Sequence, residues 1–180
     1  MKGPLDIVRE LLGNGVPHEV VHLPRRIESA HELPEVLGLP ASACVVVTLY
    51  DTDAGPGAVA HLAGATLNLG AVARSFGART VLIADATTAS LATDFSAALV
   101  APVALPADLP LVVDAAVAGA EVVYTATGDP GTALKVHGGD LLRVIRARVA
   151  VLSAAPAVGL PAARPAPVEE TSPAARASSA

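Results

Sequence analysis

The sequence predicts an α+β fold in which a mixed, mostly antiparallel, barrel-like β-sheet is flanked by helices. Helix and strand patterns alternate in the first half of the chain, and short strand patterns broken by Pro or Gly follow from Asp94 onward. Strands in such a run usually pair antiparallel. The apolar run 43–50 has four β-branched residues, which suits a strand that is buried on both faces or closed into a barrel.

The predicted helices and strands of the first half follow from local signals. Apolar residues on one helical face predict a helix over 4–13, and β-branched residues predict a strand over 18–23. Ser29 and Glu32 form a capping box for a helix that ends at Gly38, in which Pro34 removes a hydrogen bond and permits a kink. The next elements are predicted to form a hairpin and then a helix and strand that make a crossover, at 43–50, 58–63, 68–77 and 79–84.

The second half of the sequence has patterns that predict several strands and one last helix. The strand patterns cover 97–103, 109–113, 121–125 and 132–137. The helix begins at Gly139-Asp140 and turns Leu141, Ile145 and Val149 inward. Residues 1–152 therefore form one predicted domain. Residues 153–180 are nearly all Ala, Pro, Ser, Arg and Glu, so we predict a disordered tail.

The amino-acid composition limits the kinds of partner that the chain is expected to bind. Apolar residues make up 52% of it and the net charge is −5, so no extended surface for a polyanion is expected. The candidate nucleic-acid-binding residues are Lys135, Arg143, Arg146, Arg148, Arg25 and Arg26. A solvated helix face is the simpler interpretation of these residues. The single cysteine, Cys44, is expected to be a buried small hydrophobe.

Several classes of protein and site are not expected. The N-terminus lacks the apolar run of a secretory signal, and apolar stretches stop short of a membrane span; we expect a cytoplasmic protein without a membrane partner. Zinc-type His/Cys spacing, a phosphate-binding loop and a Gly-x-Ser-x-Gly elbow are all missing. No metal or other cofactor is therefore expected.

Residues 5–152 resemble a known family. The positions that carry the likeness are Leu67-Asn68-Leu69, Phe76-Gly77, Thr93-Asp94-Phe95, Pro102, Asp114, Tyr124, Gly128, Gly131 and Gly139-Asp140-Leu141. In this order they resemble the YbaK/prolyl-tRNA-synthetase-associated domain family, whose members remove mischarged amino acids from tRNA. The resemblance implies an aminoacyl-tRNA substrate, with an aminoacyl-tRNA synthetase as a further possible partner and no binding of DNA.

The resemblance also implies an ester hydrolysis site. In the family, a lysine on the first hairpin strand and backbone amides beside a Gly-x-x-x-Pro motif face the aminoacyl ester. Such donors stabilise the developing oxyanion, and losing one typically costs about 3 kcal/mol. The corresponding positions of this chain lack the expected groups: the lysine is replaced by Val46, the glycine by Ala98, a late acidic residue by Ala133 and a tyrosine by Leu23.

Other residues could replace the lost lysine. Lys135 follows Ala133 by two positions on a predicted strand, so both side chains share a face. His61 and His137 lie in predicted strands and could act as bases near neutral pH. The remaining predicted pocket residues are Thr93, Asp94, Pro102, Asp114, Gly128, Asp129 and Gly131. Asp114 could instead cap a turn, and the glycine-rich segment 127–131 could simply form a hairpin loop.

Two functions remain open from the sequence. One is an editing domain of the YbaK type that acts on mischarged tRNA with impaired catalysis. The other is a non-catalytic module that binds a tRNA end, a synthetase or a small ligand. The apolar residues at the four family positions favour the second function. The first is supported by the resemblance in fold, which does not establish catalysis.

Overall fold

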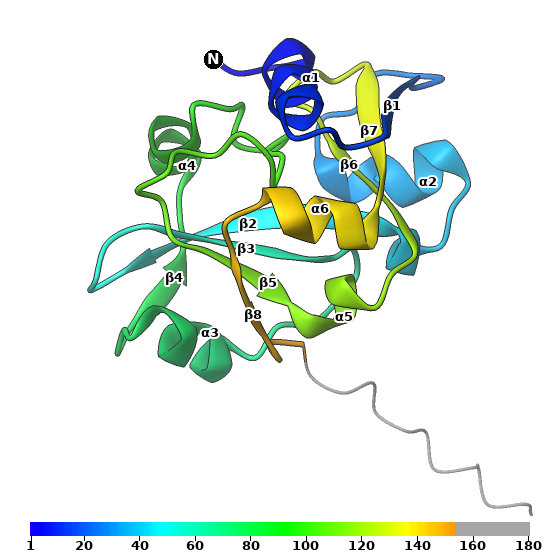
Figure 1. Ribbon diagram of the computed structural model, residues 1–180. Coiled ribbons are helices and arrows are strands. Elements are labelled where there is room, and N and C mark those ends of the chain that lie inside the picture. Colours follow the sequence, from blue (N-terminus) through cyan, green and yellow to red (C-terminus); the bar gives the residue numbers. More distant parts are fainter. Residues whose placement is uncertain (154–180) are drawn as a thin grey trace, which may run out of the picture.

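The computed structural model describes residues 1–153 of the 180-residue chain (Figure 1). The strands are β1 (His18–His22), β2 (Cys44–Thr52), β3 (Gly57–Leu62), β4 (Val81–Ile83), β5 (Leu111–Asp114), β6 (Val122–Ala126), β7 (Thr132–His137) and β8 (Arg148–Ala150). The helices are α1 (Pro4–Gly13), α2 (Leu33–Leu37), α3 (Leu69–Phe76), α4 (Ala86–Thr93), α5 (Ala115–Ala118) and α6 (Gly138–Val144), with short 3₁₀ turns η1 (Ala30–Glu32) and η2 (Ala41–Ala43). The predicted disordered tail lies outside the described residues, apart from Ser153.

All strands join one mixed sheet in the order β1-β7-β6-β2-β3-β5-β8, and β4 pairs with β2. The pairs β1–β7, β7–β6, β2–β3 and β2–β4 are antiparallel. The pairs β2–β6, β3–β5 and β5–β8 are parallel. The predicted fold class, a mixed and mostly antiparallel sheet with flanking helices, is confirmed. The antiparallel pairing expected for the late strands is wrong for β5, which lies between two parallel neighbours. It is right on only one side of β6, which pairs antiparallel with β7 and parallel with β2.

The helix-capping predictions are confirmed. The Ser29 hydroxyl accepts a hydrogen bond from the His31 amide, and the Glu32 carboxylate accepts one from the Ser29 amide. Asn68 caps α3 by accepting from the Ala71 amide. Pro34 causes no interior break, because it stands in the first turn of α2, where its missing N–H removes no helical bond.

Two predicted elements differ from the structure. Segment 97–103 is a loop rather than a strand, and Pro102 within it has no N–H for a ladder. The unpredicted helix α4 precedes this loop and is capped by Asp85, whose carboxylate accepts from the Thr88 amide. The last helix ends at Val144, and Val149 is an exposed residue of β8 rather than an inward-facing helical residue.

The sheet separates two apolar regions. Val45 and Ala60 point to the face covered by α1 and α6, and α6 lies in front of the sheet in Figure 1. Alternate residues point the other way: Val46 packs with the η1–α2 segment, and Tyr50 packs with α3. The side chain of Thr48 therefore lies between two apolar clusters on this second face. No helix within residues 1–153 is long and apolar enough to cross a membrane.

Candidate active site

A cleft lies where the edge of β2 has no strand partner. On the edge away from β3, β2 pairs with β6 through Cys44 and Val45 and with β4 from Tyr50 to Thr52. In Figure 1, β6 and β4 accordingly lie toward opposite ends of β2. The cleft between them has a volume of about 280 Å³. It is lined by Ser29, Ala30, His31, Val46, Val47, Thr48, Leu49, Ile83, Ala84, Ala86, Ala89, Ala97 and Ala98.

Two of the predicted pocket residues line this cleft. Val46 is 1% exposed and contributes to the cleft wall, and Ala98 borders it from the loop after α4. Ala98 does not have a positive φ, so its methyl group causes no backbone strain. Its carbonyl accepts a hydrogen bond from the Ala30 amide, which joins the loop to η1. Within residues 1–153, the amides of Ala97 and Ala98 donate no hydrogen bond.

Leu23 and Ala133 support the cleft without lining it. Both pack in the apolar cluster that contains Val46, and Ala133 is fully buried. The four positions predicted to depart from the family pattern are thus brought together around one cleft and its supporting cluster. Every side chain among them is aliphatic, so none can donate a hydrogen bond to a ligand.

Asp114 accepts hydrogen bonds from the backbone and does not line the cleft. It is fully buried, and its Oδ1 accepts hydrogen bonds from the amides of Leu152 and Ser153 at 2.9 and 3.2 Å. Its Oδ2 has no partner among residues 1–153.

The remaining predicted pocket residues also lie outside the cleft lining. Thr93 donates to the Ala89 carbonyl, Asp94 pairs with the N-terminal ammonium at 3.0 Å, and Asp129 accepts from the Gly131 amide. The backbone of Gly128 lies close to Lys2, with a φ of +84°.

Lys135, the predicted cationic candidate to replace a family lysine, has a partly exposed side chain. Its ammonium lies 3.0 Å from the Glu19 carboxylate, and this contact raises the pKa of Lys135. His137 is exposed beside it, at a shallow surface that includes Pro17 and Val122. Neither residue lines the cleft that contains Val46.

His61, by contrast, reaches the cleft through Thr48. His61 is 4% exposed. Its Nε2 lies 2.9 Å from the Thr48 hydroxyl, and its Nδ1 lies 3.0 Å from the Leu62 carbonyl oxygen. Burial lowers the pKa of His61 below the ordinary value of 6.5, and nearby His31 lowers it further. The Leu62 carbonyl and Asp114 act in the opposite direction without reversing the shift.

Sequence reasoning missed Thr48 and His31. Thr48 carried a signal, because it is a hydroxyl residue within an apolar strand pattern. Its proximity to His61 also follows once the hairpin register is known: Val46 pairs with His61, so Thr48 is the diagonal neighbour on the same face. His31 is exposed, and its ring centroid lies 6.3 Å from that of His61. No local pattern distinguished it from a surface histidine.

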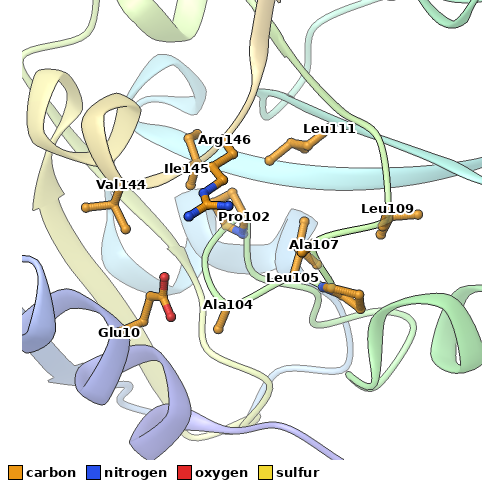
Figure 2. A pocket seen from close by; sticks show the side chains of 11 residues that line it. Glu10, Pro102, Ala104, Leu105, Ala107, Leu109, Leu111, Val144, Ile145 and Arg146 are labelled. Atoms are coloured by element: carbon orange, nitrogen blue, oxygen red, sulfur yellow. The ribbon is translucent and has the colours of Figure 1, made fainter.

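A second cavity, of about 300 Å³, is separate from this cleft (Figure 2). Figure 2 shows mainly aliphatic side chains around it, together with the charged side chains of Glu10 and Arg146. Pro102, a predicted pocket residue, lines this cavity instead of the cleft. Within the described part of the chain, no cluster of His, Cys, Asp and Glu could hold a metal ion.

The candidate nucleic-acid-binding residues are divided by the fold. Arg143 lies 3.3 Å from Asp140, and Arg25 pairs with Glu32 and Glu35. Arg146 and Arg148 join Arg74, which the sequence did not single out, in a groove of about 670 Å³. In residues 1–153, none of these three arginines forms an ion pair.

Comparisons with known proteins agree with this architecture. A structure from computational epitope-backbone grafting on scaffold proteins is 27% identical, with a TM-score of 0.73 and coverage of 84% of this chain and 97% of that chain. A candidate trans-editing enzyme for prolyl tRNA synthetase is 24% identical, with the same TM-score and coverage. No curated protein matches. The model of the aminoacyl-tRNA editing domain family matches residues 25–144, so the chain belongs to that family.

Proposed function

We propose that the cleft binds the aminoacyl end of a mischarged tRNA and hydrolyses its ester more slowly than a lysine-bearing editing site. Family membership supports the substrate class. The observation that supports the impaired rate is that Val46, the residue to which the resemblance assigns the family's reactive lysine, lies in the cleft wall. Within the described chain, the lining of this cleft includes no lysine or arginine.

The size and polarity of the cleft are compatible with a small aminoacyl group. Its walls are mainly Ala, Val and Leu, and its polar side chains are Ser29, His31 and Thr48. The unpaired amides of Ala97 and Ala98 supply donors that could stabilise an oxyanion without a lysine. The similar fold of a candidate trans-editing enzyme for prolyl tRNA synthetase supports tRNA charged on the proline acceptor as the first substrate to test.

The test is single-turnover hydrolysis of Cys-tRNA and Ala-tRNA carrying the proline acceptor. We expect slow release by the wild type and faster release by Val46→Lys, by up to about 100-fold, because the new ammonium adds a donor near the oxyanion. Val46→Met is the matched control, since it has a long side chain without charge and should give no gain. Lys135→Ala should leave the rate unchanged, because its ammonium contacts Glu19.

Three outcomes separate the alternatives. A folded Val46→Lys variant that binds tRNA but hydrolyses no faster would contradict the assigned role of the lost lysine. Wild-type binding without any turnover would favour a non-catalytic module, which the apolar packing around Val46 also suits. Failure to bind either tRNA, or its aminoacylated end, would contradict the proposed substrate.

A further inference from the structure

Thr48 and His61 form a polar pair on an otherwise apolar sheet face. Thr48 lies on β2 between Val46 and Tyr50, which belong to separate apolar clusters. Its hydroxyl lies 2.9 Å from His61 Nε2 on the neighbouring strand β3. Thr48 is half-buried and lines the cleft, whereas the His61 ring behind it is buried.

The partners of the imidazole assign its tautomer. A backbone carbonyl can only accept a hydrogen bond, so Nδ1 must carry the hydrogen that meets the Leu62 oxygen at 3.0 Å. In the neutral ring, Nε2 then has a free lone pair and accepts the hydrogen of the Thr48 hydroxyl. A hydroxyl bonded to a base that a second group orients is the arrangement found where side chains move protons.

The surroundings of His61 keep it able to accept a proton. His31 faces it from η1, and Asp114 lies on the neighbouring strand β5. The Asp114 carboxylate makes no hydrogen bond to the ring, whose two nitrogens meet Thr48 and the Leu62 carbonyl. Its Oδ1 accepts from the amides of Leu152 and Ser153, and its Oδ2 has no partner among residues 1–153. The pKa of His61 is lowered mainly by burial, so the ring is neutral near pH 7.

We infer that Thr48 and His61 form a proton relay that activates the water attacking the aminoacyl ester. This inference rests on the proposed function, since it requires the ester to occupy the cleft. Thr48 is the residue that contacts the water. His61 acts through Thr48 and is therefore a positioning and proton-holding residue behind the cleft wall.

The relay balances without a cofactor. The water oxygen bonds to the ester carbonyl carbon, a water proton passes to Thr48 Oγ1, and the hydroxyl proton of Thr48 passes to His61 Nε2. The tetrahedral intermediate then collapses and the carbon–oxygen bond to the ribose breaks. The departing ribose oxygen takes a proton back from His61 through Thr48. The products are a free amino acid and an uncharged tRNA, and both side chains return to their starting state.

Four variants test the relay in the single-turnover assay with mischarged tRNA. Thr48→Val removes the hydroxyl at constant shape and His61→Gln removes the base, and each should lower the rate on the order of 100-fold. The affinity for tRNA should not change. Thr48→Ser keeps the hydroxyl and should remain within about threefold of wild type. Thr125→Val is the matched control, because it removes a buried threonine hydroxyl that does not line the cleft.

The pH dependence of the rate and the tautomer of His61 distinguish a proton relay from a purely structural role of Thr48 and His61. The wild-type rate should fall at acid pH with a midpoint below 6.5, since protonated His61 cannot accept the proton. Thr48→Val should lose this acid limb. Imidazole nitrogen NMR of the folded wild type should show hydrogen on Nδ1 of His61 and none on Nε2. This measurement uses the wild type alone, so it does not depend on the folding of His61→Gln.

The outcomes distinguish the relay from the proposed function. Wild-type rates in Thr48→Val, or hydrogen on Nε2 in the NMR spectrum, would overturn the relay and leave editing intact. Wild-type binding of mischarged tRNA without hydrolysis would overturn the relay and favour the binding module. If no tRNA binds, both the relay and the proposed function fail.

Discussion

Asp114 connects the end of β5 to the chain that follows β8. Its buried Oδ1 accepts from two backbone amides, those of Leu152 and Ser153. Asp114→Ala should lower the free energy of unfolding by about 1–3 kcal/mol, because a buried amide would lose its acceptor. Urea unfolding measures this loss. Asp114→Asn retains an oxygen acceptor, so its free energy of unfolding should fall by less. Equal stability of the wild type and the alanine variant would contradict the stabilising role of the Asp114 hydrogen bonds.

Cys44 illustrates a residue whose sequence prediction is confirmed. It is fully buried on β2, and burial raises the pKa of its thiol to about 11. Almost none of the thiol is ionised at pH 8, and the thiolate is the reactive form. We expect a disulfide reagent to label native Cys44 much more slowly than the urea-unfolded protein. Labelling of the native protein at the unfolded rate would contradict this environment.

At the scale of elements, the contact between α5 and α6 depends on the glycine that opens α6. A Cβ on Gly138 would clash with the Ala120 carbonyl oxygen, which is a backbone atom that cannot simply rotate away. Gly138→Ala should therefore destabilise the fold by about 1–3 kcal/mol, as overpacking does. Thermal unfolding measures the change.

The neighbouring glycine provides the control for this prediction. A Cβ on Gly139 would meet only the His137 ring, at 3.6 Å. Gly139→Ala should be neutral or stabilising by up to about 1 kcal/mol, because alanine favours helix more than glycine does. Equal losses in both variants would show that the close approach to Ala120 is not the cause.

At the scale of the whole molecule, a net charge of −5 requires any binding of tRNA to be local. The exposed arginines Arg74, Arg146 and Arg148 line one groove, and none pairs with an acid of residues 1–153. Converting all three to Gln should weaken tRNA binding and reduce the salt slope of log K by about 2–3, if each contacts one phosphate.

Binding titrations at several salt concentrations measure this slope. Arg143→Gln is the control, because Arg143 already lies 3.3 Å from Asp140 and is less available to a phosphate. An unchanged slope in the triple variant would place the tRNA elsewhere on the surface. Circular dichroism checks that the triple variant is folded. If the triple variant is unfolded, single Gln variants replace it in the binding titrations.

Elements with strong local signals could be predicted from the sequence. The capping box at Ser29 and Glu32, and the helix from Asn68 to Gly77, each depend on residues within a few positions of one another. The parallel pairing of β5 and the existence of β8 could not be predicted in this way. Both depend on which distant strand offers a free edge, and no local pattern encodes that choice.

The sequence by itself determined the family resemblance and the presence of an aliphatic residue, Val46, where that resemblance implies a lysine, because both are properties of residue identity and order. The tertiary structure decided which polar side chains lie at the cleft. The register of β2 and β3 brings Thr48 against His61, while β1 brings Glu19 against Lys135 and holds that ammonium at the surface. Contacts between distant segments form only when strands pair, so their chemistry becomes visible only in the folded chain.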